Sequence, residues 1–453
     1  MSIPQFRSAW RIALLVVLGL LLLIPLTWVR SLVSERTDRA REVHNEIASK
    51  WGGEQTIQPP VLSVPYTHQY TNAKGKIEFE ETWVRMYPES LAVDAELETQ
   101  IRKRSLFEVP VYTAAMDLKG AWNLEDASAS PGDGWVRDLS RAVISVDPGE
   151  ARSLAHTPVL EVGGDPLTFS TMAVAGGLSN YMQALAGKSA KPGQKLSFRL
   201  QLVQRGSDAI SFAPAAGSTH VRLRSGWPSP SFQGTFLPDH SNISASGFDA
   251  DWSISSLNMD VPMVWRDSQV PGYCQTPNPA YTSSENPCRG LTTLSVSLAE
   301  PVNGYVSIDR SMKYGILVVG LAFLALFVFE SFLDRALHPI QYGLIGLALA
   351  MFYLLTLSIS EHLGFDIAYA ISSSVVTGLV TGYASSVLAG WKRGAILGVG
   401  LVALWSFLYT LLKAEDWALL MGSTGIFLIL ALVMWLTRRI DWNRRDAQEA
   451  DHE

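Results

Sequence analysis

The chain has 453 residues, of which 48% are hydrophobic and only 17% charged, and its formal net charge is −6. This length predicts two or three domains, and the negative charge argues against a nucleic-acid partner, which would require a basic face. The charges are unevenly spread, because residues 315–437 hold ten of them, about 8%, against about 21% elsewhere. The composition excludes a wholly soluble enzyme, a fibrous or collagen-like chain and a disordered protein.

Six apolar runs are long enough to cross a bilayer. The first, residues 12–29, carries no charge and would reach about 27 Å as a helix, close to the hydrocarbon thickness of about 30 Å. No A-x-A-like cleavage site follows it, so we expect an uncleaved anchor (residues 1–30) and keep a signal peptide as the alternative. The other runs predict a five-span bundle over residues 315–437, with Glu330 as the single charge inside them: 315–333, 340–359, 367–388, 395–412 and 417–436.

Six spans place both termini on the same side of the membrane. The short loops on that side are rich in Lys and Arg, whereas the short loops on the other side hold only Lys413. The positive-inside rule therefore predicts cytoplasmic termini, with residues 438–453 as a cytoplasmic tail. Four arginines between residues 30 and 41 conflict with this orientation, but they begin a long segment, for which the rule has less force.

The long segment between the first two spans should lie outside the cytoplasm. Its first part, residues 31–53, has Val33, Ala40, Val43 and Ile47 at helical spacing before two glycines, which predicts a helical stalk. In residues 54–314 the apolar period becomes two, as in residues 196–202, with dense turn signals between such runs. This predicts a large β-rich, sandwich-like domain with one short helix over residues 171–185.

The two cysteines of the chain, Cys274 and Cys288, both lie in this outer segment. An oxidising compartment would allow them to form a disulfide. A disulfide that closes a loop of about fifteen residues would contribute about 3 kcal/mol to the stability of the fold in the chain-entropy model. The alternative is a pair of free thiols.

Several long motifs in one order resemble the CreD family of bacterial inner-membrane proteins: SGWPSPSFQG at 225–234, GFDADW at 247–252, PVNGY at 301–305 and HPIQYGLIGLA at 338–348. The resemblance covers essentially the whole chain. It implies an inner-membrane protein with a periplasmic domain, linked to cell-envelope integrity, to colicin tolerance and to the regulon of an envelope-responsive two-component system. It implies no agreed reaction, ligand or catalytic residue.

Polar residues in or beside the spans are candidates for function. Glu330 would act in a proton or ion relay, or as a carboxylate at the inner interface paired with a nearby cation. Gln341 and Tyr342 would bond across helices or anchor the third span at the interface. Glu361, His362 and Asp366 would sense outer acidity together, or simply offset and cap helix ends.

Glycine pairs in two spans should allow close helix contact, at Gly378 with Gly382 and at Gly394 with Gly398. In the β-rich domain an aromatic segment would form an exposed groove for a peptide, glycan or lipid, with core packing as the alternative; its residues are Trp227, Phe232, Phe236, Phe248 and Trp252.

No nucleophile elbow, zinc motif or P-loop occurs, so we predict no enzyme activity, cofactor or metal, and keep an envelope enzyme with dispersed catalytic residues as a third hypothesis. The first hypothesis is an inner-membrane protein that supports cell-envelope integrity and whose periplasmic domain binds or senses an envelope component or a membrane protein. The alternative is a transporter or lipid-handling protein that uses the polar groups of its spans. The lipid bilayer is a partner in both hypotheses.

Overall fold

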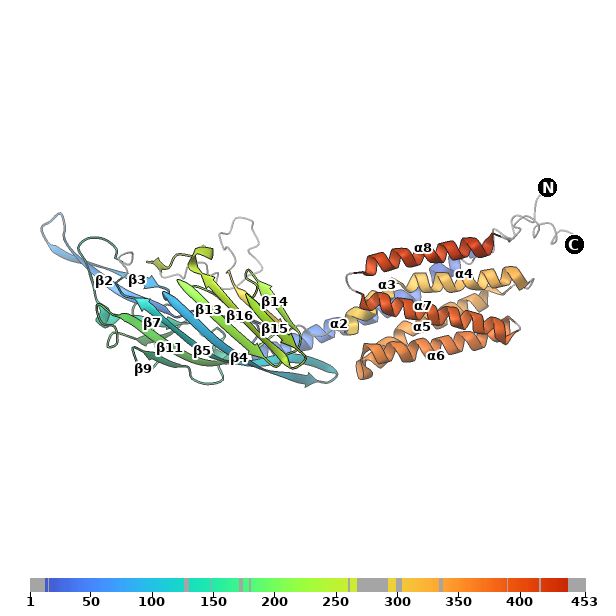
Figure 1. The fold of residues 1–453 in the computed structure, drawn as a ribbon, viewed down its shortest axis with the longest axis horizontal. Coiled ribbons are helices and arrows are strands. Elements are labelled where there is room, and N and C mark those ends of the chain that lie inside the picture. Colours follow the sequence, from blue (N-terminus) through green and yellow to red (C-terminus); the bar gives the residue numbers. More distant parts are fainter. Residues whose placement is uncertain are drawn as a thin grey trace. The chain divides into compact units, whose positions relative to one another are not determined.

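The computed structural model describes residues 13–14, 16–125, 130–147, 149–170, 174–178, 181–259, 261–266, 292–298, 304–333, 337–388, 390–414 and 417–438. The chain forms two compact units (Figure 1). The bundle unit comprises Met1–Glu42 with Val302–Glu453, and the sheet unit comprises Val43–Pro301. The domain boundaries predicted from the sequence are not tested by this division and stay predictions.

Helix α2 (Leu23–Trp51) belongs to both units, because the division falls between Glu42 and Val43. Its first half is mostly apolar and buries Leu26 and Val29 in the bundle unit, whereas its second half is rich in charged residues. The helix ends at Gly52, whose φ of +121° favours glycine and whose N–H donates to the Ala48 carbonyl at 2.8 Å. The glycine stop expected from the sequence is therefore confirmed.

An eight-stranded sheet dominates the sheet unit. All its neighbouring strands are antiparallel except β13 and β4, which run parallel. Its long central strands alternate between buried and exposed residues, so one face packs on the core and the other faces outward. The strand order is β15 (His240–Ser244), β16 (Gly247–Ser255), β13 (Ser218–Ser225), β4 (Ser90–Arg104), β5 (Phe107–Asn123), β11 (Lys195–Ser207), β8 (Val159–Val162) and β9 (Asp165–Leu167).

Two smaller sheets complete the strands of this unit. The first has the order β10 (Met182–Leu185), β7 (Val143–Val146), β2 (Val61–Thr71), β3 (Ile77–Met86) and β17 (Val264–Trp265), with β6 (Trp135–Arg137) also paired to β2. The second has the order β1 (Gln55–Ile57), β12 (Ala209–Phe212), β18 (Leu294–Leu298) and β14 (Pro230–Gly234). Three short 3-10 helices lie between strands: η2 (Leu139–Arg141), η3 (Ala151–Ser153) and η4 (Ser256–Asn258).

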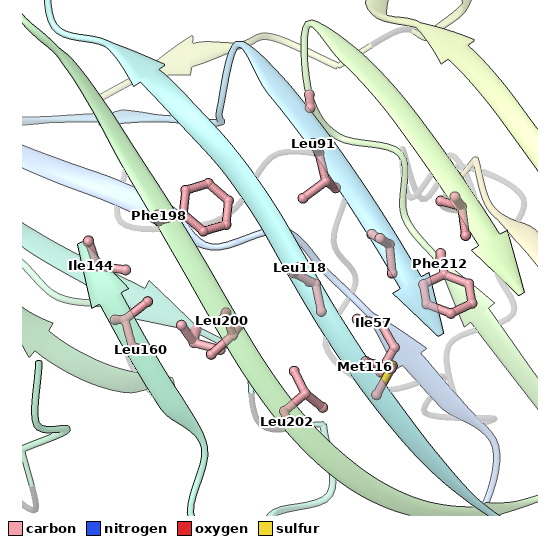
Figure 2. Close-up of a cluster of buried hydrophobic side chains, with 14 of the residues drawn as sticks. Ile57, Leu91, Met116, Leu118, Ile144, Leu160, Phe198, Leu200, Leu202 and Phe212 are labelled. Carbon is pink, nitrogen blue, oxygen red and sulfur yellow. The ribbon is translucent and has the colours of Figure 1, made fainter. Parts of the chain in front are cut away.

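All three sheets contribute to one hydrophobic core. Figure 2 shows members of this core from all three sheets: Leu118 and Leu200 of the large sheet, Ile144 of β7, and Ile57 and Phe212 of the four-stranded sheet. The β-rich class predicted from the sequence is confirmed, while the sandwich arrangement stays a prediction.

The prediction of a helix over residues 171–185 was wrong. Residues 182–185 form strand β10, which pairs antiparallel with β7. Gly176, at a φ of +78°, lies in a turn before it. The pairing with β7 buries Gln183 and Ala184 and outweighs the weak local preference for helix.

The bundle unit holds α3 (Gly304–Lys313), α4 (Gly315–Leu333), α5 (Pro339–Leu363), α6 (Phe365–Val387), α7 (Trp391–Lys413) and α8 (Ala418–Thr437). Among the described residues, four helices, one of which contains α2, are long and apolar enough to cross a membrane. A fifth results if α3 and α4, which meet at a 44° bend, count as one span, and α8 adds a shorter apolar stretch. The chain is therefore a membrane protein with a β-rich unit, and the sixth span stays a prediction.

The contact between α6 and α7 depends on one of the two predicted glycine pairs. A Cβ at Gly394 would lie 2.8 Å from the Cα of Ser385, and one at Gly398 would lie 3.2 Å from the Thr381 Cγ2. Gly378 and Gly382 have no described neighbour within 4 Å of such a Cβ. Close helix contact is thus confirmed for the pair on α7 and does not occur within this chain's described residues for the pair on α6.

Alanine at Gly394 should weaken the bundle. The added methyl group would overlap the Ser385 backbone, which cannot rotate away, and such overpacking costs about 1–3 kcal/mol. Gly394→Ala should therefore lower the unfolding temperature of the full-length protein in detergent. Gly378→Ala is the matched control, because that position is open and alanine favours helix. Equal behaviour of the two variants would contradict this account of the helix contact.

Candidate functional site

The last turn of α2 is clamped to the large sheet by Trp51. Its indole N–H donates to the Tyr112 carbonyl at 3.1 Å. The guanidinium carbons of Arg102 and Arg205 lie 4.4 and 4.9 Å from the centre of its ring, which adds two cation–π interactions. These three contacts to β5, β4 and β11 form what we call the Trp51 clamp.

About two turns earlier, His44 binds Asp208, which lies just before β12. The His44 Nε2 is 2.5 Å from the Asp208 Oδ1, and the Ser207 hydroxyl donates to Oδ2 at 2.9 Å. Burial raises the pKa of Asp208, but the hydrogen bonds from His44 and Ser207, with the His44 charge, outweigh it and hold this pKa below its ordinary value. The Leu298 N–H also donates to the Asp208 carbonyl, at 2.7 Å, so one residue joins α2, β12 and β18.

In the bundle unit, Glu361 joins α5 to α2 and α3. Its Oε1 lies 3.5 Å from the Arg36 Nε and accepts from the Tyr305 hydroxyl at 3.4 Å, and its side chain is only 12% exposed. Beside these residues Val33, Ile308 and Leu357 form a small buried cluster. Sequence reasoning missed α3 altogether, although its ten residues are amphipathic, because it assigned them to the β-rich domain.

The three residues expected to gather at the outer interface have separate contacts, and their joint sensing of acidity stays a prediction. Asp366 lies in the first turn of α6 and pairs with Lys413 of α7 at 2.8 Å, whereas Glu361 pairs with Arg36. The N-cap of α6 is Gly364 and receives no side-chain hydrogen bond, so the expected cap by Asp366 was wrong. His362 is exposed, and no polar partner for it is found among the described residues.

Glu330 bonds across helices within the bundle. Its Oε2 accepts from the hydroxyl of Tyr342 at 2.7 Å, which links α4 to α5, and Tyr342 is only 1% exposed. The cross-helix bond expected for Tyr342 is therefore present. Gln341 instead accepts from the His338 N–H at 3.0 Å and completes a capping box at the start of α5.

Several polar atoms are buried in the bundle without a hydrogen-bond partner among the described residues: Tyr353 OH, Ser372 Oγ, Thr377 Oγ1, Thr381 Oγ1 and Trp405 Nε1. Aromatic rings pack beside them, with Phe352 stacked on Trp405 at 4.0 Å. Sequence reasoning missed these atoms because isolated hydroxyl and indole groups in apolar spans form no motif. Two described hollows lie elsewhere, one along residues 27–42 of α2 and one on the large sheet.

The aromatic segment lies largely against the core of the sheet unit. Phe248 and Trp252 are buried, and the centre of the Phe232 ring lies 5.9 Å from the ring centre of each. Trp227 and Phe236 are partly buried against the same core. A ligand groove at these residues stays a prediction, and the core-packing alternative accounts for Phe248 and Trp252.

Two further predictions remain untested by these contacts. Cys274 and Cys288 fall outside the described residues, so their disulfide stays a prediction. Within the parts of the chain that the structure describes, no group of three or more His, Cys, Asp or Glu side chains is arranged to hold a metal ion.

The family model described as "Inner membrane protein CreD" matches residues 7–443. The chain belongs to the CreD family. It is 32% identical over 442 residues to the inner membrane protein CreD of Escherichia coli (strain K12), a match that covers 96% of this chain and 93% of that protein. The resemblance carried by the sequence motifs is thus confirmed. As a CreD-family chain with several bilayer-length apolar helices, this is an inner-membrane protein.

The bond between His44 and Asp208 should make the sheet unit sensitive to acid. Because the folded pKa of Asp208 is lowered, its contribution to stability is present above the ordinary carboxyl value of 3.8 and is lost as the pH falls through the folded value. Asp208→Asn should lower thermal stability at neutral pH and flatten its decrease below about pH 4. Asparagine tolerates the φ of +65° found here, so backbone strain does not confuse the result.

Thermal unfolding of the full-length protein across this pH range is the measurement. Asp133→Asn, at an exposed turn residue, is the control and should follow the wild-type curve. If the unfolding temperatures of wild type and Asp208→Asn change with pH in parallel, the Asp208 carboxylate contributes nothing to the contact with α2.

Proposed function

We propose that this protein supports cell-envelope integrity without catalysing a reaction, and that its sheet unit binds or senses an envelope component on the periplasmic side. Both termini are then cytoplasmic, as the Lys and Arg distribution favours. Family membership supports the place of action in the inner membrane. Support for the binding or sensing role comes from the contacts that α2 makes in each unit.

The observation that carries this proposal is that one unbroken helix is packed in both units. Leu26 and Val29 of α2 are buried with the bundle helices, whereas Val43 and Ala48 are buried in the sheet unit. A helix without a break transmits rotation along its axis, because each turn is fixed by its own hydrogen bonds. Binding at the sheet unit can therefore bias the bundle helices that contact α2.

Each half of α2 also has specific polar contacts. The Trp51 clamp and the His44–Asp208 bond hold its end in the sheet unit. The Arg36–Glu361 pair, at 3.5 Å, holds its first half in the bundle unit, with Arg30 placed 3.5 Å from Asp309 of α3. The Arg30–Asp309 pair is exposed and contributes little stability, whereas Glu361 is only 12% exposed, and in this proposal both pairs set the rotation of the helix.

Insertions after Glu42 test the role of α2. One added alanine rotates the following residues by about 100°, whereas seven added residues rotate them by only about 20° relative to the original face. We expect the one-residue insertion to abolish detergent resistance in cells that lack the native gene, and the seven-residue insertion to retain most of it. The amount and the unfolding temperature of each variant in membranes serve as controls. If a folded one-residue variant protects cells fully, α2 is only a tether.

A second candidate function, transport or lipid handling, is favoured by the bond between Glu330 and Tyr342 inside the bundle. An ionisable side chain within a span is costly and often marks a path for ions or protons. The partly exposed carboxylate and its buried tyrosine partner would then exchange a proton or contact a polar headgroup.

Removing the charge at Glu330 separates the two functions. Glu330→Gln keeps the size and an acceptor for Tyr342, so the bundle should remain folded. If the first function holds, this variant should protect cells as well as the wild type. Loss of protection by a normally inserted Glu330→Gln protein, with Tyr342→Phe giving the same defect, would favour transport. Gln341→Ala, which affects only a helix cap, is the neighbouring control.

A further inference from the structure

The outward face of the eight-stranded sheet carries a hollow of about 730 Å³ that the proposed function has not used. It crosses the neighbouring strands β16, β13, β4 and β5, whose alternation turns every second side chain away from the core. The side chains that face outward here are small or polar. We call this site the serine hollow.

Strand register sets three serines in one row. Ser218 of β13 lies opposite Ser255 of β16 and Ser90 of β4. Neighbouring strands are about 4.8 Å apart, so their hydroxyl groups form a regular line across the sheet. The hydroxyls of Ser90 and Ser218 have no hydrogen-bond partner among the described residues, and both side chains are exposed. This row can both donate and accept hydrogen bonds.

A second row, two residues along each strand, supplies larger polar groups. His220 lies opposite Ser253, with its Nδ1 3.0 Å from the serine Oγ. Lys119 stands in the same row on β5, across Ala92 of β4. The histidine and lysine flank a floor of serine and alanine, which leaves room for a ligand to lie flat on the sheet.

Beneath the floor, on the core-facing side of the sheet, Gly120 of β5 lies opposite the buried Leu91 of β4. A Cβ at this position would lie 2.6 Å from the Phe198 ring and still closer to the Ser90 carbonyl oxygen. A side chain therefore does not fit, and the backbone of β5 approaches β4 and the core ring at this point. The residues that line the hollow all belong to β4, β5, β13 and β16, so the sheet itself forms it and loops do not.

The charges nearest to the serine hollow are already paired. Along the sheet from the serine hollow, Asp117 binds both Arg199 and Lys119 at 2.9 Å. Arg222 binds Asp249 at 2.8 Å and Arg224 binds Asp94 at 3.0 Å. The surface therefore offers many hydrogen-bonding groups and little net charge, which suits an uncharged ligand with many hydroxyl groups better than an ion.

We propose that the serine hollow binds an uncharged glycan segment of the cell envelope. This inference rests on the proposed function and names the class of envelope component that the sheet unit recognises. The glycan lies across the strands, exchanges hydrogen bonds with Ser90 and Ser218, and is bounded by His220 and Lys119. Its hydroxyl groups replace the water that these side chains otherwise bind.

The test measures binding of a neutral β-1,4-linked N-acetylglucosamine tetramer to the full-length protein in nanodiscs by calorimetry. The Ser218→Tyr variant fills the middle of the hollow, and a tyrosine on an exposed strand is compatible with the fold. We expect this variant to bind the tetramer at least about tenfold more weakly, a difference of about 1.4 kcal/mol. Gln201→Tyr, on the outward face of β11 and outside the hollow, is the matched control and should bind like the wild type.

Three results would overturn the proposal: no binding of the tetramer, equal binding by Ser218→Tyr, or tighter binding of an anionic galacturonate tetramer that Ser218→Tyr abolishes. A failure here is distinct from failure of the proposed function. If the α2 insertions give the expected phenotypes while the tetramer does not bind, the sheet unit recognises something other than a neutral glycan. If the tetramer binds as expected while the insertions are silent, the glycan site stands and the relay through α2 does not.

Discussion

The structure depends on one helix that satisfies two environments at once. The first half of α2 must bury apolar side chains among membrane helices, and its second half must end on a β-sheet in water. Leu26 and Val29 meet the first requirement, and Trp51, held between Arg102 and Arg205, meets the second. Between them the helix has no glycine or proline that would interrupt its hydrogen bonds.

Ion pairs near the ends of the bundle helices position these elements more than they stabilise them. Glu361 contacts α2 and α3, while Asp366, only five residues later, contacts α7. The turn at Gly364, with its φ of +78°, separates two carboxylates that are neighbours in the sequence. On the large sheet the same kind of pairing joins Arg and Lys to Asp, so the serine hollow is a hydrogen-bonding surface whose nearby charges are paired.

Inside the bundle, contact comes from close packing and from a small number of polar bonds. In lipid the hydrophobic effect does not drive helices together, so close packing at small residues and hydrogen bonds contribute more of the association free energy. Gly394 and Gly398 bring α7 against α6, and Tyr342 joins α5 to Glu330 of α4. The hydroxyls of Ser372 and Thr377 are buried in the same unit without a partner among the described residues, and such burial costs each its hydration.

By itself the sequence determined what depends on local pattern: apolar runs of bilayer length, the change to a period of two, the glycine stop of α2 at Gly52, and motifs long enough to indicate the family. The tertiary structure alone decided which distant residues meet. Residues 182–185 became a strand because β7 pairs with them, and α3 became part of the bundle unit because Ile308 is buried with Val33 and Leu357. The row of serines exists only through strand register. Such pairings join residues far apart in the chain, and local periodicity carries no information about them.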